Sequence, residues 1–101
     1  MPIVAKSIGF QQLDATALAS AVGFTLPVDS SGSKPNGAYL SSFTGNVRYR
    51  DDGTAPTAAI GMRLVAGNDP FLFMGNMEKF KAILEGGSPT LNITYVLLSP
   101  G

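Results

Sequence analysis

The amino-acid sequence predicts an all-β protein, a single antiparallel β-sandwich of the jelly-roll type with about eight short strands. Turn-forming residues recur at short intervals and leave apolar segments of about five to eight residues, a length that suits strands better than helices. Apolar and polar residues alternate in several of these segments, which is typical of strands with one buried face. The 101 residues fit one domain with one core.

Residues 1–13 are expected to be either the first strand of the sandwich or an apolar arm that docks on a neighbouring chain. Lys6 is the only basic residue in this stretch. An exposed apolar segment can add to the sheet edge of a neighbour or cover that edge. The candidate assembly contacts in this segment are Ile3, Val4, Ile8 and Phe10.

The next segments carry weaker signals. The alanine-rich residues 15–21 can form a short helix or a loop, and residues 22–26 predict a second strand that Pro27 ends. Residues 28–37, VDSSGSKPNG, are rich in turn formers and predict a flexible surface loop. We expect this loop to touch neighbouring chains as well.

Strand signals are stronger after the loop. Further strands are predicted over residues 38–43, 46–50, 60–65, 71–74, 80–85 and 91–98. The apolar members of the clearest alternating runs predict the core: Val47, Tyr49, Ile60, Met62, Leu64, Phe80, Leu84, Leu91, Ile93 and Tyr95.

The densest polar cluster lies at the end of the segment 46–50. Adjacent strand residues point to opposite faces, so two neighbouring carboxylates would converge on a metal only inside a turn. The spacing also departs from that of a calcium-binding loop. We therefore interpret the cluster as a structural turn, in which a glycine takes a positive φ and the aspartates cap the turn or pair with arginine. Its residues are Arg48, Arg50, Asp51, Asp52 and Gly53.

Composition argues against several chemistries. The chain has no Cys and no His, so it lacks thiolate nucleophiles, the commonest general base and the commonest metal ligand. The sequence predicts no catalytic, cofactor or metal site, and the protein is expected not to be an enzyme. Seven basic and seven acidic residues cancel, which gives no basis for binding nucleic acid or a membrane surface. The N-terminus does not resemble a signal peptide, and synthesis in the cytoplasm is expected.

Two segments are apolar on both strand faces. Leu72 lies between two phenylalanines, and Val96 and Leu98 flank Leu97. Either these segments are buried on both sides, or one outer face of the sandwich docks on another molecule. Leu72 and Val96 are therefore further candidate assembly contacts.

Residues 46–67, NVRYRDDGTAPTAAIGMRLVAG, and residues 89–95, PTLNITY, resemble a group of small β-sandwich virion proteins of tailed bacteriophages. The shared pattern is an arginine–aromatic–arginine strand followed by DDGT, a PT pair and an apolar segment between glycines. The closing strand departs from it, because Val96 follows Tyr95 where an aromatic pair is usual. The resemblance implies a sandwich fold and no catalytic residue.

The resemblance implies a virion structural protein, most simply a capsid decoration or cement protein that binds the major capsid protein and its own copies. A neck or tail adaptor or a fibre component of the same fold is the first alternative. A carbohydrate-binding module is the second, although the chain has no Trp and only three tyrosines, of which Tyr49 and Tyr95 are expected to point inward. The implied location is the virion, with no cofactor.

Overall fold

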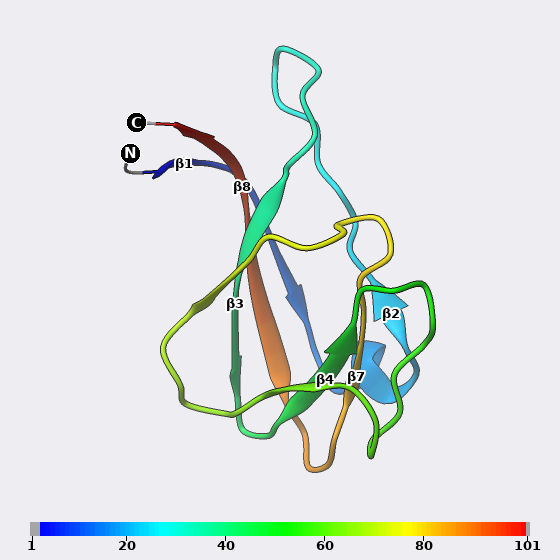
Figure 1. The fold of residues 1–101 in the computed structure, drawn as a ribbon. Coiled ribbons are helices and arrows are strands. Elements are labelled where there is room, and N and C mark those ends of the chain that lie inside the picture. Colours follow the sequence, from blue (N-terminus) through cyan, green and yellow to red (C-terminus); the bar gives the residue numbers. More distant parts are fainter. Residues whose placement is uncertain (1–2, 101) are drawn as a thin grey trace.

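Over the part of the chain that the structure describes, two four-stranded antiparallel sheets face each other, which confirms the predicted all-β sandwich with eight strands (Figure 1). The structure is a computed structural model that describes residues 3–100, with side chains from 4 to 99. The first sheet, here called sheet A, has the order β1 (Ile3–Leu13), β8 (Thr90–Pro100), β3 (Gly37–Phe43), β6 (Phe71–Phe73). Sheet B has the order β2 (Val22–Gly23), β7 (Lys81–Leu84), β4 (Val47–Arg50), β5 (Met62–Leu64).

The N-terminal segment is a strand of sheet A rather than a detached arm. β1 pairs antiparallel with β8 along its whole length, with one irregularity between Ser7 and Gly9. On the other side of β8, the ladder with β3 begins only where Gly37 pairs with Val96. The first residues of β1 and the last residues of β8 therefore extend past β3 as a two-stranded ribbon, which curves away from the body in Figure 1.

The second predicted strand is shorter than its pattern suggested. β2 contains only Val22 and Gly23, and the chain then leaves the sheet so that the ring of Phe24 can stack on Phe80, with centroids 3.9 Å apart. The alanine-rich segment before it forms a single turn of 3-10 helix, η1 (Ala17–Ala19). The Asp14 carboxylate accepts a hydrogen bond from the Ala17 N–H, and Leu18 is fully buried beneath the turn.

An aromatic cluster fills the space between the sheets. Phe24, Phe73 and Phe80 contact the rings of Tyr49 and Tyr95. Burial raises the pKa of Tyr95 to about 12, and its hydroxyl remains satisfied by Gln11 and by the N–H of Thr25. The predicted core is confirmed for Val47, Tyr49, Leu64, Phe80, Leu91, Ile93 and Tyr95, all of which are buried.

The prediction was wrong for Ile60 and Met62, which are 58% and 64% exposed. Ile60 lies in the turn before β5, where it exchanges two backbone hydrogen bonds with Thr57. Met62 does point to the inner side of sheet B with Leu64, but β5 is an edge strand and β6 does not cover it there. Leu84 is half-buried against the core.

The segment 28–37 projects from the body as a hairpin-like loop (Figure 1). The Asp29 carboxylate organises its tip by accepting hydrogen bonds from the N–H groups of Ser31 and Ser33 and from the Ser31 hydroxyl. These bonds hold the pKa of Asp29 below its usual range. At the base of the loop, the side-chain amide of Asn36 bonds both backbone groups of Leu98 in β8.

Candidate functional site

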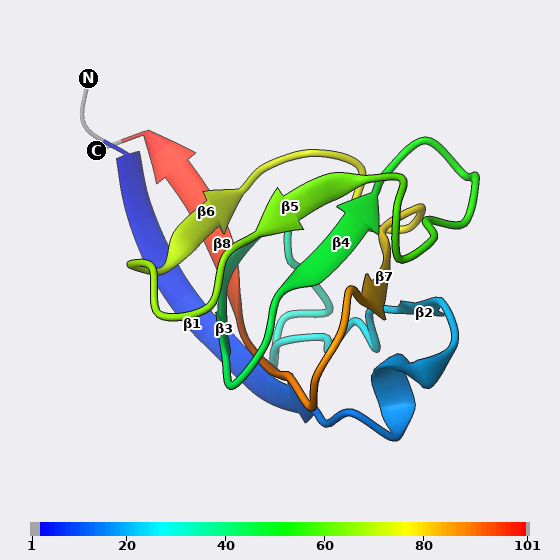
Figure 2. The ribbon, with the colours of Figure 1, turned by 90° about the horizontal axis from the view of Figure 1, so that it is seen from below.

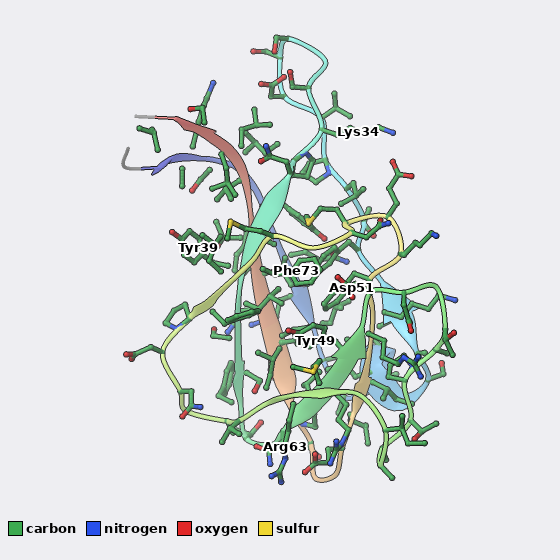
Figure 3. The ribbon with its side chains drawn as sticks, in the orientation of Figure 1. Lys34, Tyr39, Tyr49, Asp51, Arg63 and Phe73 are labelled. Carbon is green, nitrogen blue, oxygen red and sulfur yellow. The ribbon has the colours of Figure 1, made fainter. Side chains whose placement is uncertain are left out.

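The outer face of sheet A presents a row of uncharged, mostly apolar side chains that crosses all its strands. Phe10 on β1 pairs with Thr94 on β8, Thr94 pairs with Tyr39 on β3, and Tyr39 pairs with Leu72 on β6. Directly paired residues share a face, so the four side chains form one line. Phe10 is 65% exposed and Tyr39 is 37% exposed. Figure 3 shows Tyr39 pointing away from the body, whereas Tyr49 and Phe73 lie between the sheets.

This outer face is uncharged over the residues that the structure describes. The neighbouring row is polar and neutral, since Gln12 pairs with Asn92 and Asn92 with Ser41, and the Gln12 amide bonds Asn92 at 2.9 Å. Lys6 is the single charged residue in the strands of sheet A. It lies between two outward-facing residues of β1, so its own side chain points to the opposite face. We call this surface the sheet A face; its outward side chains include Ala5, Ser7, Phe10, Gln12, Tyr39, Ser41, Phe43, Leu72, Asn92 and Thr94.

The candidate assembly contacts do not all lie on this surface. Phe10 and the half-buried Leu72 do, whereas Ile8 sits at the irregularity in β1 and packs against the core. Val4 is 51% exposed on the ribbon. The side chain of Ile3 lies outside the described residues.

Val96 is not an assembly contact, because its side chain is fully buried within the chain. Its cross-strand neighbour is Gly37, and the Leu98 side chain lies over that glycine, 2.7 Å from where a Cβ would stand. The Leu98 side chain therefore covers Gly37 at this end of the sheet, and the fully buried Val96 offers no surface to a partner. Sequence reasoning missed Tyr39 and Phe43, although their alternation with Ala38 and Leu40 was a signal that they face outward.

The outer face of sheet B is charged. Arg48 on β4 pairs directly with Arg63 on β5, an arrangement that is repulsive by itself. The carboxylate of Glu85, just after β7, offsets this repulsion between the two arginines. Arg63 donates two close hydrogen bonds to its carboxylate, at 2.7 and 2.9 Å, and Arg48 Nε lies 2.9 Å from Oε2 without being aligned for a hydrogen bond. The bonds from Arg63 hold the pKa of Glu85 below its usual range.

The polar cluster at the end of β4 divides between separate partners. Asp52 pairs with Arg50 and accepts the N–H of Thr54, and the bond from Arg50 lowers the pKa of Asp52. Asp51 Oδ2 instead accepts the N–H of Asn76, after β6, at 3.2 Å. The two neighbouring carboxylates therefore serve different segments. Gly53 has φ +89°, the positive φ that the turn was expected to require.

A groove of about 570 Å³ runs between the edge strands β5 and β6. Figure 2 shows these two strands along one side of the sandwich, where neither sheet continues. Exposed apolar side chains of Met62 and Phe71 line it, together with the charged residues Arg63 and Asp69. No nucleophile–base pair converges there.

Within the described residues, no group of three potential metal ligands occurs, and no helix is long and apolar enough to cross a membrane. Comparisons with protein-family models, with curated proteins and with solved structures gave no match. The candidate site is therefore defined by the structure alone, as the uncharged sheet A face.

Proposed function

We propose that this chain is a structural protein of a tailed-bacteriophage virion, a decoration or cement protein that docks on the major capsid protein. The observation that carries the proposal is the sheet A face, an uncharged surface with a mostly apolar row across four strands. Such a surface loses little hydration of charge when another molecule covers it. Contacts of this kind need shape and apolar area rather than a reactive group, in keeping with the virion resemblance of residues 46–67.

We also propose that the sandwich is a jelly roll. Its support is the pairing of the strands: β1 with β8, β2 with β7, β3 with β6 and β4 with β5. This is the pairing expected when one long antiparallel ribbon is rolled into two sheets, an architecture that viral capsid domains use. The proposal assigns no catalytic step and no cofactor to the chain.

The proposal is tested by mass-spectrometric quantification of the chain in purified particles of the phage that encodes it. A decoration protein is expected in a number comparable to the major capsid protein. A copy number as low as that of a neck or tail ring would favour the adaptor or fibre alternative over decoration. Absence from purified particles would contradict a virion role altogether.

One observation favours a second candidate, a carbohydrate-binding module. The exposed rings of Phe10 and Tyr39 lie beside the amide and hydroxyl groups of Gln12, Asn92 and Ser41. Sugar sites combine a flat aromatic ring with such polar groups, although this face lacks tryptophan. Binding to an array of polysaccharides, with loss of binding in Tyr39→Ala, would support this candidate; an array without any signal would remove it.

A further inference from the structure

The four edge strands of the two sheets are very unequal. β2 has two residues, β5 and β6 have three each, and β1 has eleven. A short edge offers few free backbone groups, which is one way in which proteins avoid pairing with other chains. β1 lacks that protection.

Part of the β1 edge is covered by the chain itself. The side chain of Gln11 bonds both the hydroxyl and the N–H of Thr25, and Pro27 packs on Gly9. The segment from Val4 to Ser7 is different, because each of its residues is exposed and the backbone hydrogen bonds of the described residues join it only to β8. The opposite edge of the same ribbon is capped at Leu98 by the side chain of Asn36. The exposed edge is therefore confined to one side of the ribbon.

The chemistry of this edge identifies what can occupy it. A row of free N–H and C=O groups is satisfied by another extended strand. A two-stranded ribbon is also marginally stable unless it packs on something further. Lys6 is the only charge in β1, so a second copy of the same strand meets little like-charge repulsion. We propose that the β1 edges of two copies of this chain pair antiparallel about a two-fold axis, which joins their A sheets into one continuous sheet.

Charge and side-chain orientation select the register of this pairing. A two-fold axis normal to the sheet keeps every outward residue facing outward. Because directly paired residues of an antiparallel ladder share a face, the axis must lie level with a residue and not between two adjacent residues. An axis through Lys6 would place the two lysines opposite each other. An axis through Ala5 places Val4 of each copy opposite Lys6 of the other, so that the lysine stem covers the valine. The axis through Ala5 is therefore the favoured one.

This pairing would supply the contact between copies that the proposed function requires, but purified protein tests it separately. The chain has no cysteine, so Ala5→Cys introduces a single thiol. Cα atoms of paired residues lie about 4.5–5.5 Å apart across an antiparallel ladder, within the range that a disulfide spans. We expect Ala5→Cys to form a disulfide-linked dimer at least about tenfold faster than Ala58→Cys, a matched change at an exposed loop position. Equal rates would overturn the pairing.

A second measurement does not depend on a disulfide. Sedimentation of the unmodified chain is expected to show a monomer–dimer equilibrium with a Kd of about 1 mM or tighter. Val4→Lys adds a charge to the edge and is expected to weaken dimerisation at least about tenfold, whereas the matched change Val65→Lys has no such effect. A chain that stays monomeric at about 1 mM, or a dimer that Val4→Lys leaves unchanged, would overturn the proposal. Particle binding can succeed or fail in either case, so the two proposals are judged apart.

Discussion

The two outer faces of this sandwich differ in their charge and in their exposed apolar side chains. The sheet A face is uncharged and carries exposed aromatic rings, whereas sheet B carries Arg48, Arg50, Arg63 and Lys81 on its strands. The arginines of sheet B are held by Glu85 and Asp52 of the same chain. The three arginines are thus paired within the chain and, among the residues that the structure describes, Lys81 is the charged strand residue of sheet B for which no ion pair is seen. The sheet A face instead leaves apolar area uncovered, and for this reason the proposed docking function is placed on sheet A.

The largest expected effect on stability comes from substitutions in the core between the two sheets. Ile93 is fully buried in β8, a central strand, and Ile93→Ala is expected to lower the free energy of unfolding by about 3–5 kcal/mol. Leu64→Ala, on an edge strand, should lower the free energy of unfolding by only about 2 kcal/mol, because the surrounding residues can partly fill the space left by the side chain. Denaturant unfolding measures the free energy of unfolding of both variants. Met62→Ala, two residues away and exposed, is the control and should change this free energy by less than about 0.5 kcal/mol.

The next effect concerns the turn that follows β4 on sheet B. Gly53→Val should lower the free energy of unfolding by about 1–3 kcal/mol, since a β-branched residue is strained at φ +89°. The control is Gly86→Val, at a glycine without positive φ and with open space around it, which should change stability little. Equal losses in the two variants would show that backbone strain at Gly53 is not the cause.

A smaller effect is expected for the ion pairs of sheet B, and it depends on pH. The folded pKa of Glu85 is lowered, so its stabilisation is present above the unfolded pKa and is lost as the pH falls through the folded one. At pH 7, Glu85→Gln should have a lower unfolding temperature than wild type, because Arg48 and Arg63 are no longer neutralised. The two curves should draw together only as the pH falls below the usual pKa of a glutamate carboxyl, about 4.3. Parallel curves at all pH values would mean that the carboxylate charge contributes nothing.

The smallest effect is expected at the two neighbouring carboxylates. Asp51→Asn retains an oxygen that can accept the Asn76 N–H. Asp52→Asn likewise retains an oxygen for the Thr54 N–H and removes only the charge of an exposed pair with Arg50. Both variants should unfold close to the wild-type temperature and bind particles normally. Stoichiometric binding of a divalent ion that both substitutions abolish would overturn the structural interpretation of this turn.

The alternation of apolar and polar residues predicts which face of a strand a residue occupies, but it does not predict where that strand lies in its sheet. Alternation identified Val47, Tyr49 and Ile93 as inward-facing, because a strand has only two faces. It could not report that β5 lies at an edge, and so it placed Met62 in the core although the facing sheet does not cover it. Strand order depends on long-range pairing that no local pattern encodes.

The candidate site was predicted less well than the fold, for a related reason. Leu72 and Phe10, two of the predicted assembly contacts, do lie on the outer face, whereas the side chain of Val96 is buried within its own chain. Tyr39 was read as one of three tyrosines without an assigned contact. Only the register between β1, β8, β3 and β6 brings these residues into one row.

The central claim is that the sheet A face, and not the apolar groove beside the edge strand of sheet B, docks on the virion, and one pair of variants tests it most directly. Phe10 and Met62 are both apolar and are 65% and 64% exposed, Phe10 on the sheet A face and Met62 in the groove between β5 and β6. Phe10→Asp and Met62→Asp should therefore fold alike, which thermal unfolding checks first. In co-sedimentation with particles stripped of the chain, Phe10→Asp is expected to bind at least about tenfold more weakly than wild type, and Met62→Asp within about twofold of it. Wild-type binding by Phe10→Asp, or an equal loss in Met62→Asp, would contradict the claim.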